Sequence, residues 1–124
     1  MKALKPILVL IVIVVIAYFF TPSNFRDGWL YYGYGRILDV TGSQSQALNA
    51  FKTSADAMPE SIRFARTYAR TLNDIAEASD SQSYFQTAET YAEDWIDDYV
   101  NNSELWQMYI ELARAEWGQG SRSA

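Results

Sequence analysis

The sequence predicts an all-α protein, in which an N-terminal transmembrane helix is followed by a small array of helices. Three observations support this fold class. An uncharged apolar run extends from Ile7 to Phe20. After it, apolar residues recur three and four residues apart, which is the spacing of a helix face. No stretch alternates polar and apolar residues as a strand does, and no hairpin-turn sequence occurs.

The composition favours a binding protein over an enzyme. The chain has 124 residues, a formal charge of −5, and neither cysteine nor histidine. These absences exclude thiol nucleophiles, disulfides, histidine general bases, and zinc sites built on cysteine or histidine. We therefore expect no catalytic residues, no cofactor and no metal. The length suits one short domain.

Residues 1–20 have the composition of a membrane anchor. Lys2 and Lys5 precede the apolar run, and three aromatic residues end it at Phe20. As a helix, residues 3–20 would be about 27 Å long, a short but workable span of a hydrocarbon core of ~30 Å. Because the lysines come before the span, we expect a single-pass protein of the bacterial inner membrane, with its N-terminus cytoplasmic and its C-terminal domain periplasmic.

A cleaved signal peptide is the alternative interpretation of the same segment. Bulky residues follow Ala17 where a cleavage site needs small ones, and Thr21-Pro22-Ser23 is the only candidate site. Cleavage would release a soluble periplasmic or secreted peptide-binding protein that begins near Asn24. In either case, residues 21–124 retain eight basic and fifteen acidic side chains and carry a charge of −7. Nucleic acid is therefore an unsuitable ligand.

Five helices are predicted after the anchor, and capping residues define their ends. We expect them at residues 24–40, 43–58, 59–78, 80 or 81–100, and 103–117. Ser43 with Gln46 forms a capping-box pattern, and Pro59 suits the first turn of a helix. Asp80 or Ser81, and then Ser103, would cap the last two helices. Gly118 would end the helical domain of residues 21–117, leaving 118–124 as a flexible polar tail.

The first two of these helices carry a spaced motif. It reads Tyr31-x2-Tyr34-Gly35-x2-Leu38, then Ala47-x3-Phe51, then Pro59. This part of the chain, from about Asp27 to Pro59, resembles a tetratricopeptide repeat (TPR). Independently of the resemblance, small residues at Gly35 and Ala47 would let two helices approach closely, with Tyr34, Leu38 and Phe51 filling the space beside them.

Two weaker copies of the first-helix motif follow. They read Ala65-x2-Tyr68-Ala69-x2-Leu72 and Trp106-x2-Tyr109-Ile110-x2-Ala113, with seven additional residues between them. We therefore expect a TPR-like array of two helix-turn-helix repeats plus a final helix. A plain antiparallel helical bundle is the alternative.

The resemblance implies a groove lined by the first helix of each repeat, in which an extended peptide or a helix binds. The residues expected to form this partner-binding groove are Trp29, Tyr32, Arg36, Arg63, Arg66, Arg70 and Asn73. The last helix would add Glu104, Gln107, Glu111 and Arg114. Trp29 and Tyr32 could equally rest on the membrane interface or contact a transmembrane partner.

Arg63, Arg66 and Arg70 form the most distinctive feature of the sequence. They stand at i, i+3 and i+7, so they share one face of a helix. Two explanations remain open. Glu104 and Glu111 could pair with them internally, or the arginines could bind an anionic group of a ligand through bidentate hydrogen bonds.

The sequence thus predicts a membrane-anchored protein–protein interaction module. It would act as an adaptor, an assembly factor or an accessory subunit of a membrane protein complex. One further cluster, Glu93, Asp94, Asp97 and Asp98, could bind a divalent cation or a basic partner, but exposed carboxylates on one helix more commonly form a solvated face.

Overall fold

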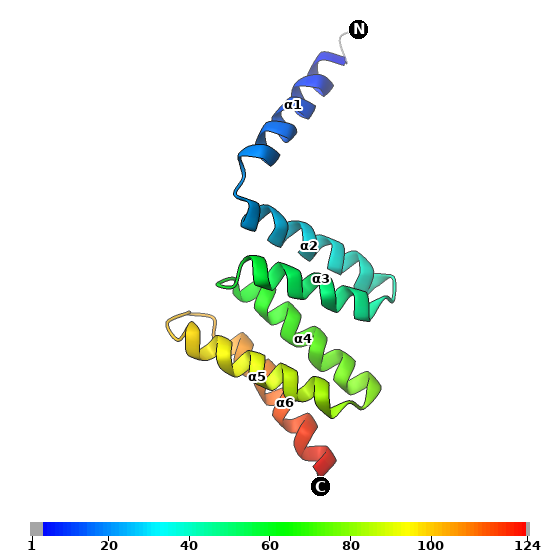
Figure 1. Cartoon of the computed structure of the whole chain (residues 1–124), viewed down its shortest axis with the longest axis vertical. Coiled ribbons are helices and arrows are strands. Elements are labelled where there is room, and N and C mark those ends of the chain that lie inside the picture. Colours follow the sequence, from blue (N-terminus) through cyan, green and yellow to red (C-terminus); the bar gives the residue numbers. More distant parts are fainter. Residues whose placement is uncertain (1–3, 124) are drawn as a thin grey trace.

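The computed structural model describes residues 4–123, which form six helices and no strand. Residues 1–3 of the predicted anchor, with Lys2, and Ala124 of the predicted tail lie outside the described residues. From α2 onward each helix folds back on the one before it, and the helices stack in chain order away from α1 (Figure 1). The helices are α1 (Leu4–Phe20), α2 (Ser23–Val40), α3 (Gln44–Ala57), α4 (Ile62–Ser79), α5 (Gln82–Asp98) and α6 (Trp106–Ser123).

The first hairpin depends on a close approach of α3 to α2. A Cβ atom at Gly35 would lie 2.6 Å from Cε1 of Phe51, a ring that is almost fully buried. Ala47 on α3 is completely buried, so the predicted role of both small residues is confirmed. Tyr34 is 53% exposed and does not fill this space as expected. The Phe51 ring already occupies the position over Gly35, which leaves Tyr34 at the edge of the contact.

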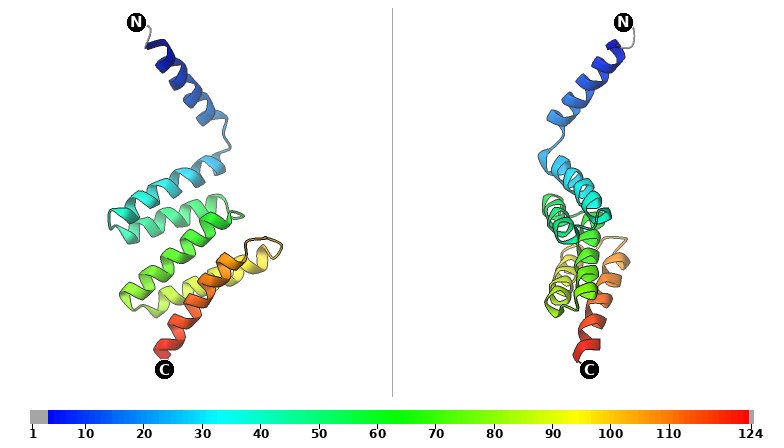
Figure 2. Two further views of the ribbon diagram at one scale, coloured as in Figure 1. Left: turned by 180° about the vertical axis from the view of Figure 1, so that it is seen from behind. Right: turned by 90° about the vertical axis from the view of Figure 1, so that its right-hand side faces the viewer.

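Helix α4 lies at the centre of the array and contacts α3, α5 and α6. Its inward face buries Phe64, Ala69 and Leu72. Only Asp80 and Ser81 separate α4 from α5, so the additional residues of the second repeat lie within helices and not in a loop. Figure 2 shows the result from two more directions: α2, α4 and α6 follow one another along the array.

One predicted helix start needs correction, and two predicted caps are specified further. Helix α4 begins at Ile62 and not at Pro59, because Ser61 is its cap: the Ser61 hydroxyl accepts a hydrogen bond from the amide of Phe64 (3.3 Å). Ser43 precedes α3 as expected, but its side chain makes no capping hydrogen bond, so the predicted capping box is absent. Asp80 is the left-handed C-cap of α4 (φ 56°), and Ser81 is the N-cap residue of α5.

The C-terminal boundaries also differ from the prediction. Helix α5 ends at Asp98, before Val100, and α6 begins at Trp106. In the turn between them, Asn102 Oδ1 accepts a hydrogen bond from the amide of Glu104. Helix α6 then continues through Gly118 to Ser123, so the predicted stop and the polar tail over 118–123 are wrong. Gly118 serves close packing instead of termination, since a Cβ there would overlap the Phe85 ring of α5.

Helix α1 is not packed against the array. Every one of its side chains is exposed, from Leu4 to Phe20. Taken singly, no helix within residues 4–123 combines the length and the apolar character needed to cross a bilayer. Helices α1 and α2 satisfy that test only as a pair, which is bent by 115° at the short break between them.

The approach of α2 and α3 gives a test that compares two glycines of one helix. Gly35→Ala would force the Cβ onto Phe51, so we expect the free energy of unfolding to fall by about 1–3 kcal/mol. Gly33 faces open space, and a Cβ atom there would meet no other atom within 4 Å. Gly33→Ala should therefore raise the free energy of unfolding by up to about 1 kcal/mol through helix propensity. Urea unfolding of the full chain in detergent, followed by circular dichroism, measures the free energy of unfolding of both variants. Equal changes in the two variants would contradict the packing described.

Candidate functional site

A basic groove lies along the face formed by α2, α4 and the start of α6. Its volume is about 350 Å³. It brings together four arginines, three close together on α4 and one from α2, and we call it the arginine groove. It is lined by Tyr32, Arg36, Ile62, Arg63, Arg66, Thr67, Arg70, Glu104 and Gln107. Of the predicted groove residues, Tyr32 and the four arginines line it, as do Glu104 and Gln107.

Trp29 lies at the rim of the arginine groove. Its ring packs edge-on against Phe64 and Tyr32, with centroids 5.1 and 5.8 Å apart. The guanidinium carbon of Arg63 stands 5.6 Å from the Trp29 centroid, within the range of a cation–π contact. Trp29 therefore positions one cation of the groove while 41% of its own surface stays exposed.

Within the described residues, the arginines of the groove form no ion pair. Among the side chains that the structure describes, none of Arg36, Arg63, Arg66 and Arg70 has a carboxylate oxygen within 4.0 Å. Glu104 accepts a hydrogen bond from Gln107 instead (3.2 Å). We call Arg63, Arg66 and Arg70 the arginine stripe. Internal pairing with Glu104 and Glu111, one of the two explanations for this stripe, is therefore not the arrangement found. The groove presents four cations and one carboxylate.

Asn73 does not line the groove, contrary to the prediction, because α6 crosses α4 at this position. Asn73 is completely buried, and its Nδ2 donates to the backbone oxygen (2.9 Å) and the Oε1 (3.1 Å) of Glu111. Glu111 is also buried, at 2% exposure. The two side chains join α4 to α6 behind the arginine groove.

Arg114 completes this network. Unlike the groove arginines, Arg114 is paired with carboxylates. It pairs with Glu111 (2.9 Å), Asp74 (2.8 Å) and Glu77 (2.9 Å). Burial opposes the charge of Arg114, but the hydrogen bonds to Asp74 and Glu77 and the charge of Glu111 outweigh it and raise the guanidinium pKa above its ordinary value. Arg114 and Glu111, both expected to face the groove, thus form the α4–α6 connection.

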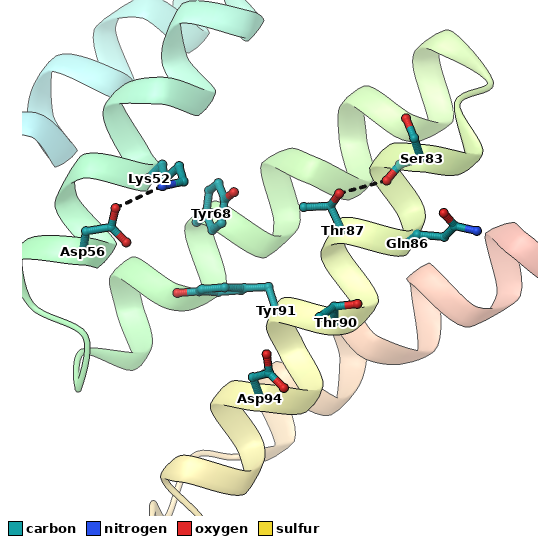
Figure 3. Close-up of a pocket in the computed structure, with 9 residues that line it drawn as sticks. All are labelled: Lys52, Asp56, Tyr68, Ser83, Gln86, Thr87, Thr90, Tyr91 and Asp94. Carbon is teal, nitrogen blue, oxygen red and sulfur yellow. Dashed lines mark hydrogen bonds and ion pairs between the residues drawn. The ribbon is translucent and has the colours of Figure 1, made fainter.

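A second hollow, of about 620 Å³, opens between α3, α4 and α5 (Figure 3). Tyr68 and Tyr91 meet edge-on in it at 4.8 Å, and Lys52 pairs with Asp56 at 3.2 Å. Burial raises the pKa of both tyrosines, so their hydroxyls stay neutral. Because Lys52 is neutralised by Asp56, this hollow has no excess of positive charge. Sequence reasoning missed it, since its residues come from three helices and form no motif.

The acidic residues Glu93, Asp94, Asp97 and Asp98 are all exposed along α5. Within the described part of the chain, no three carboxylates are arranged to hold a metal ion. The arrangement agrees with a solvated face.

Comparison with known proteins adds no further identification. No family model matches the chain, and neither a curated protein nor a solved structure is significantly similar to it.

Proposed function

We propose that this chain is a membrane-anchored, TPR-like protein–protein interaction module that binds an acidic protein segment in the arginine groove. The observation that carries the proposal is the convergence of four arginines, none of which has a carboxylate oxygen within 4.0 Å among the described residues. Like charges held together are destabilising until an anion joins them, and guanidinium groups bind carboxylates through paired, charge-assisted hydrogen bonds. The remainder of the chain is acidic, so the groove is an electrostatic exception on its own surface.

The TPR-like part of the proposal is supported by the stacking of antiparallel helix pairs, with α2, α4 and α6 following one another along one face. Two repeats and a final helix form only a short groove. Affinity for one short peptide in the micromolar range, about 8 kcal/mol, would be reasonable. Attachment to the same membrane as the partner would strengthen association through effective concentration, as suits an adaptor, an assembly factor or an accessory subunit.

The membrane part of the proposal is supported by the surface of α1. Fourteen large apolar side chains between Leu4 and Phe20 are exposed. At about 1.5 kcal/mol each, leaving them in water forgoes on the order of 20 kcal/mol of transfer free energy. A bilayer would recover it, and Lys5 at the start of α1 favours a cytoplasmic N-terminus, with the array in a bacterial periplasm. The alternative is a soluble periplasmic or secreted peptide-binding protein released by signal cleavage.

The groove proposal predicts a selective loss of binding. Arg66→Gln with Arg70→Gln should weaken binding of a fluorescent glutamate-rich peptide at least tenfold, since each charge-assisted hydrogen bond lost is worth about 1.5–3 kcal/mol. Fluorescence anisotropy with the full chain in nanodiscs measures this. Lys52→Gln is the matched control, because it removes a cation outside the groove.

A glutamine-for-glutamate copy of the peptide tests whether charge is required, and an amidated copy separates side-chain carboxylates from the terminal one. Equal affinity of the double variant and the parent protein would contradict the proposal.

The anchor proposal predicts that α1 remains on the mature protein. After expression in a bacterium, we expect the chain in membranes that have been washed with alkaline carbonate, with an intact mass of 14.1 kDa. Recovery in the periplasmic fraction, with a mature N-terminus near Asn24, would establish the soluble alternative instead.

A further inference from the structure

Helix α2 carries a second apolar face that no other part of the array covers. Leu30 and Ile37 are 58% and 65% exposed, and Gly33 between them faces open space. Leu30, Gly33 and Ile37 are spaced three and four residues apart, so they share one face of the helix. This face is opposite the buried Gly28 and Gly35. We call Leu30, Gly33 and Ile37 the outward face of α2.

The outward face of α2 differs in charge from the exposed surface of α5. The one charged residue in line with it is Arg26, a turn before Leu30 and next to α1. By contrast, α5 exposes Glu93, Asp94, Asp97 and Asp98. Arg26 pairs with Asp27 (3.7 Å), so the strip carries no net charge, and an uncharged apolar strip on a helix surface is suited to the boundary between acyl chains and headgroups. Helix α6 has a comparable strip, Trp106, Ile110 and Trp117, but at the opposite end of the array.

The connection between α1 and α2 sets the direction of this face. Nη1 of Arg26 donates to the backbone oxygen of Tyr18 (3.3 Å), and the Arg26 guanidinium stacks over the Tyr18 ring at 4.4 Å. The Thr21 hydroxyl donates to the backbone oxygen of Ala17. These contacts accompany the 115° bend, which turns α2 slightly past perpendicular to α1. If α1 crosses a bilayer, α2 runs along its surface, with the rest of the array on the far side (Figures 1 and 2).

The length of α1 brings this junction close to the lipid. Helix α1 has 17 residues, which corresponds to about 26 Å, against ~30 Å of hydrocarbon. A short span pulls its flanking residues towards the bilayer. Phe19 and Phe20, which are 74% and 83% exposed at the end of α1, are residues that favour an apolar or interfacial setting.

We propose that the outward face of α2 rests in the headgroup region of the bilayer that α1 enters, so that α2 is an interfacial helix. This inference rests on the membrane anchor of the proposed function. It assigns the lipid surface as the occupant of Leu30, Gly33 and Ile37. The contact would hold the array in one orientation, with the arginine groove at a fixed angle to the membrane.

Single-cysteine labelling tests the inference directly, because the chain contains no cysteine. The fluorophore NBD would be attached to the full chain at Ile37→Cys, with Leu30→Cys as a second position on the same face. Val12→Cys reports on α1. Ile110→Cys is the matched control, since Ile110 is 50% exposed on the apolar strip of α6. Each labelled protein is reconstituted into liposomes of phosphatidylethanolamine and phosphatidylglycerol.

We expect blue-shifted emission at positions 12, 30 and 37, quenched by lipid-borne nitroxide and shielded from iodide. Position 110 should emit as in water and be quenched by iodide. A lipid-embedded label at 12 with water-exposed labels at 30 and 37 would overturn the inference and leave the anchor intact. A water-exposed label at 12 would overturn the anchor as well. Shielding at 37 without lipid quenching would show a protein contact, and lipid quenching at 110 would remove the assigned orientation; either result overturns the inference.

Discussion

The buried contact of Asn73 with Glu111 joins α4 to α6, and both helices contribute residues to the arginine groove. It fixes α6 across α4, and α6 with its preceding turn supplies Glu104 and Gln107 to the groove. A charged residue at 2% exposure is stable only when its hydrogen-bonding capacity is satisfied. Asn73 and Arg114 provide those partners, so the position of α6 is set by the requirement to satisfy a buried carboxylate.

The same network explains why the groove stays positively charged. Arg114 engages three carboxylates, those of Asp74, Glu77 and Glu111. Two of these lie on α4, the helix that also carries the arginine stripe, and each is held on the side facing α6. Arg114 thus holds these carboxylates on the side of α6, and among the described residues the three arginines of the groove on α4 have no carboxylate oxygen within 4.0 Å. Separation of charge across a single helix produces the site.

Sequence reasoning predicted the features that depend on periodicity. The five helices after the anchor were expected near their observed positions, and the face shared by Arg63, Arg66 and Arg70 follows from their spacing alone. The close approach at Gly35 was also predicted, because Gly35 and Ala47 are small residues at motif positions of two neighbouring helices.

The errors occur where tertiary contacts override local signals. Asn73 continues the stripe in sequence, yet α6 covers it. Gly118 has the pattern of a helix stop, but its small size accommodates the Phe85 ring, and the helix continues. Pro59 was expected to begin a helix, but the hydroxyl of Ser61 caps α4 instead. In each case the deciding partner is distant in sequence or depends on side-chain geometry, which spacing patterns do not contain.

A photo-crosslinker placed in the arginine groove would identify what binds there. Thr67 lines the arginine groove and Thr90 lines the second hollow, so p-benzoyl-phenylalanine at either position samples one site. We expect that, in native membranes, the probe at 67 crosslinks to an acidic segment of a partner, as identified by mass spectrometry, while the probe at 90 does not. Capture of the same segments from both positions, or of segments without acidic residues at 67, would contradict it.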